Sequence, residues 1–249
     1  MKIIIGGILG KMGERLQECC KIDTSFQIVA GFDFLQKECV YPIFNPPFDC
    51  DLSADLVIDF STPSTTELIL DFCIAKKIPI LIATTGLSKN QLAKIKKLSS
   101  EIPILLTSNT SLGAFITENC SISIAKSLKE ENIKHQIEII ETHHNQKKDV
   151  PSGTALSLAN SINMVYNNQN GLLIGRNQGF SFPQNNEICI HSLRGGNVVG
   201  KHEVYFFLGD EVISITHQVY DKKVFAWGAL SLAKKLIKHK NGLYSVQTV

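Results

Sequence analysis

The sequence predicts an α/β protein with a Rossmann-like, parallel-sheet dinucleotide domain and a smaller α+β domain with a mixed sheet. Three observations predict this fold. Short apolar, β-branched runs alternate with helical patterns over the first 111 residues, which is typical of a parallel sheet covered on both faces. A glycine-rich turn follows the first run, as in dinucleotide-binding folds. Beyond that point, strands of period two become frequent.

The N-terminal part is expected to alternate strands and helices. Strands are expected where apolar runs end in glycine, aspartate or a small polar loop, and helices where apolar residues recur at helical spacing. Prolines at 42, 46 and 47 make 38–52 an irregular stretch. The expected strands cover 2–5, 27–32, 56–60, 79–83 and 103–106, and the expected helices cover 12–21, 65–76 and 88–99.

The second part is expected to hold a long helix, a strand, a shorter helix and then antiparallel strands separated by glycine turns. These elements cover 114–128, 136–141, 154–164 and 187–216, with a loop at 167–171 and a last helix at 225–239. Residues 1–111 with 219–249 would form the dinucleotide-binding domain, and 112–218 the substrate-binding and oligomerisation domain. The active site is expected in the cleft between them, with hinge closure around both ligands.

Composition excludes several classes of protein. The chain has 249 residues, a hydrophobic fraction of 44% and a net charge of +2, so it lacks the general basic field of a nucleic-acid-binding protein. The apolar N-terminus, Met1–Gly7, is too short for a signal peptide or a membrane span. Seven cysteines without a C-x-x-C pair argue against disulfides and zinc, so no metal is expected. A cytoplasmic location follows from these features.

A glycine turn between the first strand and first helix predicts a pyrophosphate site. Gly7, Gly10 and Gly13 have G-x-x-G-x-x-G spacing, and the helix N-terminus adds partial positive charge. Asp33, about twenty positions further on, stands where a carboxylate holds ribose hydroxyls. Because Phe34 and not arginine follows it, NADH is mildly favoured over NADPH. A tight turn without a ligand is the alternative.

Two small polar loops follow later strands of the same sheet. They are Ala83-Thr84-Thr85-Gly86 and Thr107-Ser108-Asn109-Thr110. Ligands of open parallel sheets bind at the carboxyl ends of the strands, so these loops could contact a nicotinamide ribose or carboxamide. Ordinary loop capping explains either one equally well.

The densest polar segment runs from Glu141 to Ala155. It contains His143, His144, Lys147 and the Ser152-Gly153-Thr154 turn that opens a helix. Imidazole titrates near neutral pH, lysine supplies a compact positive charge, and a helix N-terminus offers N–H groups to a carboxylate. This combination suits an anionic substrate that must also receive a proton. A structural or exposed histidine pair, or a metal site with Asp149, is the alternative.

These motifs, in this order, resemble the 4-hydroxy-tetrahydrodipicolinate reductase family over essentially the whole chain. The segment Arg194-Gly195-Gly196-x-x-x-Gly200-x-His202 also fits. The resemblance implies a cytoplasmic homotetramer that reduces a small cyclic dicarboxylate with a hydride from NADH or NADPH. It also implies site residues: His143 as proton donor and acceptor, Lys147 as second proton donor, His144, Ser152, Gly153 and Thr154 for substrate, and Gly7, Ile8, Leu9, Gly10, Lys11, Met12, Asp33, Ala83, Thr84, Thr85, Thr107, Ser108, Asn109 and Thr110 for cofactor.

Two alternatives from other classes stay open. One is a different NAD-dependent oxidoreductase of the same fold, similar to aspartate dehydrogenase. The other is a non-catalytic dinucleotide sensor, which would bind NADH without turnover.

Overall fold

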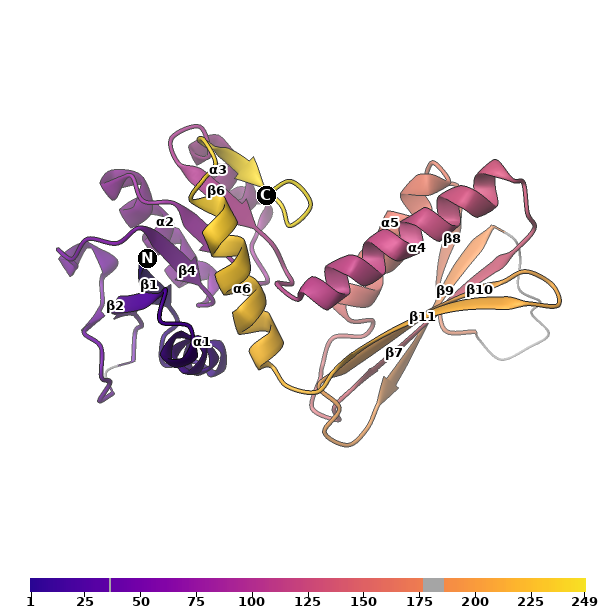
Figure 1. The fold of residues 1–249 in the computed structure, drawn as a ribbon, viewed down its shortest axis with the longest axis horizontal. Helices are drawn as coiled ribbons and strands as arrows, with labels where there is room; N and C mark the ends of the chain where they lie inside the picture. Colours follow the sequence, from indigo (N-terminus) through magenta and orange to yellow (C-terminus); the bar gives the residue numbers. More distant parts are fainter. Residues whose placement is uncertain (36, 177–185) are drawn as a thin grey trace. The chain divides into compact units, whose positions relative to one another are not determined.

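The computed structural model describes residues 1–35, 37–176 and 186–249. It divides into two compact units (Figure 1). Unit 1 comprises Met1–Ser111 and Lys222–Val249, and unit 2 comprises Leu112–Asp221. The chain therefore leaves unit 1 once and returns to complete it. Within the described ranges, every helix is too short or too polar to cross a bilayer.

Unit 1 is built on a seven-stranded sheet of order β12-β6-β5-β4-β1-β2-β3, in which every neighbouring pair is parallel. Parallel strands bring their carboxyl ends to one edge of the sheet, so the loops that follow them gather there. The strands are β1 (Lys2–Gly6), β2 (Gln27–Phe32), β3 (Ile43–Phe44), β4 (Leu56–Asp59), β5 (Ile80–Ile82), β6 (Pro103–Leu106) and β12 (Gly242–Tyr244).

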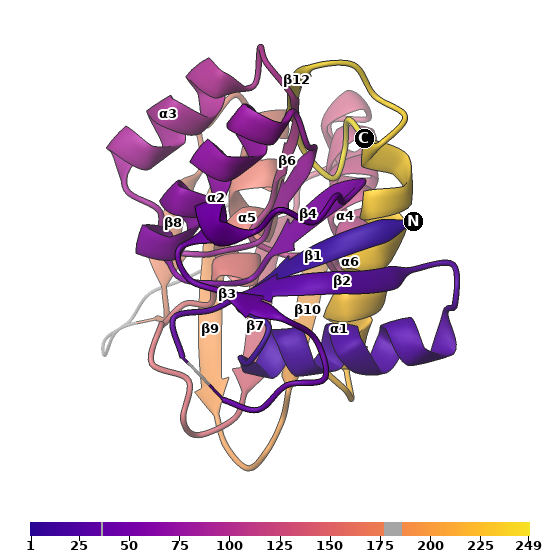
Figure 2. The ribbon, with the colours of Figure 1, turned by 90° about the vertical axis from the view of Figure 1, so that its left-hand side faces the viewer.

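Helices cover both faces of this sheet, which explains why its strands are apolar at successive positions. Ile3 and Ile5 face one side with α1 (Lys11–Ile22) and α6 (Lys223–Leu236), whose buried residues share their core. Ile4 faces the other side, where α2 (Pro63–Lys76) and α3 (Lys89–Leu98) pack. Figure 2 shows the two pairs of helices on opposite sides of the strands. This is the Rossmann-like parallel-sheet domain predicted from the sequence.

Unit 2 contains a five-stranded mixed sheet of order β11-β10-β7-β9-β8. Helices α4 (Leu112–Glu130) and α5 (Gly153–Val165) pack on a single face of it, around Ile137, Ile139 and Phe206. Residues of β7 alternate accordingly between buried and half-buried. The strands are β7 (Gln136–His143), β8 (Gly171–Ile174), β9 (Glu187–Arg194), β10 (Gly200–Phe207) and β11 (Val212–Val219).

The structure corrects the predicted strand pairing in the second part. β10 is antiparallel to β7 and β11, but β9 is parallel to β7 and to β8. The glycine turn after Arg194 does not close a hairpin, because β7 lies between β9 and β10. The crossover through α5 allows β8 and β9 to run parallel to β7. Period-two patterning within a strand does not reveal such a parallel partner.

Three short strands were not predicted. β3 and the 3-10 turn Pro47–Asp49 lie within 38–52, which was expected to be irregular. β8 begins at Gly171, the last residue of a predicted loop, and β12 follows the last helix. Each of these strands lies at an edge of its sheet, where few residues suffice for pairing and the apolar pattern is weak.

Helix α6 packs against the rest of unit 1 through a close approach between Gly228 and Thr110. A Cβ added to Gly228 would lie 1.7 Å from the carbonyl oxygen of Thr110, and the Thr110 hydroxyl donates to the carbonyl of Phe225 at 2.7 Å. No side chain fits between these two stretches of backbone, so only glycine permits this contact.

We expect Gly228→Ala to lower the thermal unfolding midpoint, because the helix must move away from Thr110. Overpacking of this kind costs about 1–3 kcal/mol or more. Ser231→Ala, an exposed change in the same helix, is the matched control and should be nearly neutral. Differential scanning calorimetry checks both variants, and equal midpoints would show that the contact does not hold α6 in place.

Candidate active site

The glycine turn after β1 brings the backbone close to the uncapped N-terminus of α1. Gly7 has φ +73°, and a Cβ there would lie 2.9 Å from the carbonyl oxygen of Phe60. Gly10 is the N-cap of α1, and no side chain caps this helix end. The first-turn N–H groups of a helix have no partner within the helix, so an anion can bind them. These residues fit a dinucleotide phosphate.

Asp33 lies directly beside this turn. It is 7% exposed, and its Oδ2 accepts a hydrogen bond from the Leu9 backbone N–H at 3.0 Å. Its Oδ1 accepts from the Leu35 N–H at 3.1 Å. The carboxylate therefore joins the end of β2 to the glycine turn, and its remaining lone pairs could accept ribose hydroxyls.

The two polar loops of unit 1, residues 83–86 and 107–110, contain side chains that bond within the protein and side chains that are exposed. The Thr84 hydroxyl donates to buried Asp59 at 3.2 Å, and Thr107 bonds within its own loop to Asn109. Burial raises the pKa of Asp59, while hydrogen bonds from Ser61, Thr66 and Thr84 oppose this. The Thr110 hydroxyl is also directed inward, towards α6. Thr85 and Ser108 are exposed, so their side chains are the ones available to a ligand here.

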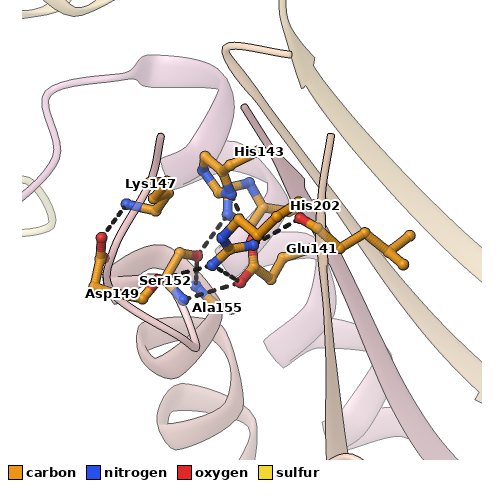
Figure 3. A network of polar contacts seen from close by, with 9 residues as sticks. Glu141, His143, Lys147, Asp149, Ser152, Ala155 and His202 are labelled. Atoms are coloured by element: carbon orange, nitrogen blue, oxygen red, sulfur yellow. Dashed lines mark hydrogen bonds and ion pairs between the residues drawn. The ribbon is translucent and has the colours of Figure 1, made fainter. Parts of the chain in front are cut away.

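In unit 2, the alternation along β7 places Glu141 and His143 on the helix-covered face of the sheet. Both are buried, Glu141 completely, whereas His144 follows the strand and is half-buried. The Nδ1 atom of His143 lies 2.5 Å from Oε2 of Glu141 (Figure 3). Of the two histidines, His143 is the one that a buried carboxylate holds.

Glu141 is the centre of a polar network (Figure 3). Arg194 donates to both of its oxygens, from Nη1 at 2.9 Å and from Nη2 at 2.7 Å. The Ser152 backbone N–H donates to Oε1 at 3.1 Å. Arg194 also donates to the carbonyl of Asp149 at 2.7 Å. The network thus connects β7, β9 and the loop that leads into α5.

Burial and neighbouring groups together set the pKa values of Glu141 and His143. Burial would raise the pKa of Glu141, but hydrogen bonds outweigh it and lower this pKa to about 2. The largest of these effects comes from Arg194, followed by Ser192, His143 and the Ser152 N–H. Burial lowers the pKa of His143 despite the contact with Glu141, and nearby Lys147 and Arg194 lower it further. Glu141 is therefore ionised and His143 is neutral at pH 7 in the free protein.

The N-terminus of α5 lies against this network. The Ser152 hydroxyl caps the helix by accepting from the Ala155 N–H at 3.2 Å, and it lies 3.1 Å from Nε2 of His202. Gly153 is exposed and Thr154 half-buried, so the first turn is open to a ligand. Burial, with smaller effects from neighbouring charges, lowers the pKa of His202 to about 3, which keeps this ring neutral.

Lys147 lies at the edge of the network. Its ammonium pairs with Oδ1 of Asp149 at 2.8 Å (Figure 3). Asp149 is well exposed, and the Lys147 side chain is 21% exposed. A substrate carboxylate could therefore replace Asp149 as the partner of Lys147 without a change in the fold.

A second cluster lies on the opposite face of the same sheet. Glu138, Cys189 and His191 offer possible metal-ligand atoms within 4.8 Å of one another. Glu138 also pairs with the Arg176 guanidinium, and its Oε2 lies 2.6 Å from Nε2 of His191. The Arg176 guanidinium already pairs with this carboxylate, and a positive charge there disfavours a bound cation.

Three residues of the network were missed as site residues by sequence reasoning. Glu141 and His202 stood inside recognised motifs, and Arg194 opened one. A signal for Glu141 existed: an acidic residue in phase with buried Ile137 and Ile139, two positions before a histidine, needs a partner in the core. The contacts of Arg194 and His202 depend on strand pairing and leave no local signal.

Comparisons with known proteins cover both parts of the chain. Residues 1–110 match the family model described as dihydrodipicolinate reductase, N-terminus, and residues 113–249 match the model for its C-terminus. The chain belongs to the dihydrodipicolinate reductase family. A 4-hydroxy-tetrahydrodipicolinate reductase of Clostridium novyi (strain NT) is 39% identical, over 100% of this chain and 97% of that protein. The corresponding protein of Caldanaerobacter subterraneus subsp. tengcongensis is 40% identical, over 99% and 97%.

Solved structures share the fold. Dipicolinate-bound dihydrodipicolinate reductase from Paenisporosarcina sp. TG-14 aligns with a TM-score of 0.80 and 21% identity, over 98% of this chain and 97% of that one. Aspartate dehydrogenase from Thermotoga maritima aligns with a TM-score of 0.50 and 12% identity, over 95% and 96%. The family fold is thus the one predicted, and related dehydrogenases share its outline.

We expect Arg194→Gln to destabilise the protein most at neutral pH. Removing one partner of a buried ion pair costs about 3–5 kcal/mol, because the other charge stays buried. Without the guanidinium, burial raises the pKa of Glu141 in the folded state. Folding then takes up a proton, so the deficit relative to the wild type shrinks as the pH falls.

Urea unfolding followed by circular dichroism at several pH values measures this deficit. The control is Arg15→Gln, which breaks an exposed pair with Glu18 in which both side chains are 39% exposed. Such pairs contribute about 0–1 kcal/mol. A loss of unfolding free energy in the Arg194 variant that is small and independent of pH would contradict the expectation.

Proposed function

We propose that the chain reduces 4-hydroxy-tetrahydrodipicolinate to tetrahydrodipicolinate with NADH or NADPH, a step of diaminopimelate and lysine biosynthesis. In this reaction the substrate loses one water and gains a hydride and a proton. The observation that carries the proposal is the cluster of His143, Lys147 and the α5 N-terminus, in a chain whose two parts both match the family.

The cluster suits a small ring with two carboxylates. Lys147 and the open first turn at Gly153 and Thr154 would bind the carboxylates, with His144 and the Ser152 hydroxyl as further contacts. Binding a dianion beside His143 favours its charged form and so raises its pKa from the lowered value of the free protein. Substrate binding would thereby load the imidazole with a proton.

His143 would then deliver this proton to the ring at the atom that becomes electron-rich during reduction, and Lys147 would act as the second donor. Positioned general acids contribute roughly 10²–10⁴-fold to rates. Holding the dianion at fixed cations also reduces the entropic cost of reaction. The protein supplies position and charge for these steps.

The nicotinamide dinucleotide, when bound, supplies the hydride. Residues 7–12 and Asp33 would hold its pyrophosphate and adenosine ribose. Residues 83–85 and 107–110 would hold the nicotinamide half, through Thr85, Ser108 and backbone groups. NADH is the preferred form in this proposal, because the Asp33 carboxylate would repel a 2′-phosphate and exposed Phe34 offers it no donor.

Unit 1 is therefore the proposed dinucleotide-binding domain, and unit 2 the proposed substrate-binding domain. The cytoplasmic location and the homotetramer, in which unit 2 would provide the subunit contacts, stay predictions from the family resemblance.

We expect Lys147→Ala to lower kcat/KM by about 100-fold or more, since a cation and a proton donor are lost together. NADH binding should be unchanged, because Lys147 belongs to unit 2. A coupled assay, in which the upstream synthase supplies fresh substrate, follows NADH absorbance. Lys148→Ala, the exposed neighbour, is the control and should retain activity.

The same assay separates the rival functions. An aspartate dehydrogenase-like enzyme would oxidise or form an amino acid and leave the cyclic dicarboxylate unreduced. A sensor would bind NADH with no turnover. Either outcome for the wild-type protein would refute the proposed reaction.

We expect Asp33→Asn to raise the KM for NADH about tenfold or more, because hydrogen bonds to a charged group contribute about 1.5–3 kcal/mol. The KM for NADPH should change less or fall, since a repulsive charge is removed. Initial rates measured with both cofactors give the ratio of the two KM values. Asp51→Asn, an exposed change in a loop of the same unit, serves as the control. An unchanged ratio would show that Asp33 does not select the cofactor.

A further inference from the structure

We propose that Glu141 is a positioning residue, which fixes His143 for proton transfer at Nε2 and couples this ring to the anion-binding end of α5. The inference deepens the proposed function and rests on it.

The two oxygens of Glu141 have separate tasks. Oε2 lies 2.5 Å from Nδ1 of His143, and Oε1 accepts from the Ser152 N–H at 3.1 Å. Arg194 donates to each of them. Glu141 has no exposed surface, so solvent does not compete for these bonds. A single carboxylate thus holds both the proton carrier and the residue that caps α5.

This contact decides the tautomer of His143. An ionised carboxylate only accepts hydrogen bonds, so Nδ1 must carry the hydrogen of the neutral ring. Nε2 is then the nitrogen that gains and loses the proton. Gly200 lies beside this atom, and any side chain there would crowd it, because a Cβ on Gly200 would lie 3.1 Å from Nε2. Among the described residues, none hydrogen-bonds to Nε2.

The charge of Arg194 tunes this arrangement. Burial lowers the pKa of His143, the contact with Glu141 opposes this, and the charges of Lys147 and Arg194 lower the pKa further. The free ring is therefore neutral, and an incoming dianion supplies the extra negative charge that protonates it. The charged and titratable groups that face His143 are Glu141 on β7, Arg194 on β9, His202 on β10, and Lys147 in the following loop.

The connection through Ser152 links binding to proton transfer. A substrate carboxylate at the first turn of α5 would contact a helix end whose cap is hydrogen-bonded to Glu141. A displacement of the helix end would therefore be transmitted to His143 through Glu141. The same arrangement keeps the imidazole in place while no ligand is bound.

The first experiment reads the tautomer without turnover. In two-bond ¹H–¹⁵N correlation spectra of the free enzyme with labelled histidine, assigned by comparison with His143→Gln, we expect the Nδ1–H form for His143. The Nε2–H form would overturn the proposal. Because no substrate is used, this result stands even if the proposed reaction is wrong.

The second experiment uses Glu141→Gln, which keeps an acceptor but removes the charge. We expect kcat to fall about tenfold or more, within the range of general acid catalysis, while the KM for NADH stays unchanged. The pH at which activity is lost on the alkaline side should move down, because the imidazolium loses its counter-charge. If Glu141 had only a structural role, its replacement would reduce the amount of folded enzyme but would leave the alkaline side of the pH profile where it is.

The chain provides a matched control in Glu138→Gln. Glu138 lies on the same strand, pairs with Arg176 and His191, and faces the opposite side of the sheet. Its variant should keep the wild-type pH profile. If Glu141→Gln also keeps that profile, or if both variants shift it equally, Glu141 does not position the proton carrier. Circular dichroism and NADH binding establish that each variant is folded.

Discussion

The ion pair between Glu141 and Arg194 is the interaction on which the polar network around His143 depends. A carboxylate without solvent contact is costly to bury, and the guanidinium that reaches both of its oxygens makes the largest contribution to offsetting this cost. The pair requires β7 and β9 to be neighbours, and their parallel register places Arg194 opposite His143. The loop between His143 and α5 must also fold back, so that Ser152 and Asp149 reach the pair. Fold and site are thus specified by the same contacts.

Much of unit 1 could be predicted from the sequence because its determinants are local. Buried parallel strands appear as uninterrupted apolar runs such as Ile3-Ile4-Ile5, and each run ends in a loop of small polar residues. The glycine turn is recognisable because its backbone conformation excludes side chains, as at Gly7. The cluster around His143 and Lys147 was found for a similar reason: its polar residues are close together in sequence, where no core would need them.

The parts that were missed depend on partners far apart in the chain. Arg194 is separated by 53 residues from Glu141, and Ser152 by 50 from His202, so no spacing rule connects them. The pairing of β9 with β7 follows from the crossover connection and not from the alternation within either strand. The inward direction of Thr84 and Thr110 was equally invisible, because a threonine in a loop has the same sequence signature whether it contacts a ligand or the core.

The interrupted path of the chain through unit 1 has a consequence for its synthesis on the ribosome. The strand face that α6 covers, around Ile3, Ile5 and Ile58, lacks that helix until residues 223–236 have been made. At about 5–20 residues per second, translation of the intervening unit takes on the order of ten seconds. During that interval the apolar residues of this strand face have not yet met the helix that buries them. A chain that ends before α6 would lack the helix that buries this strand face.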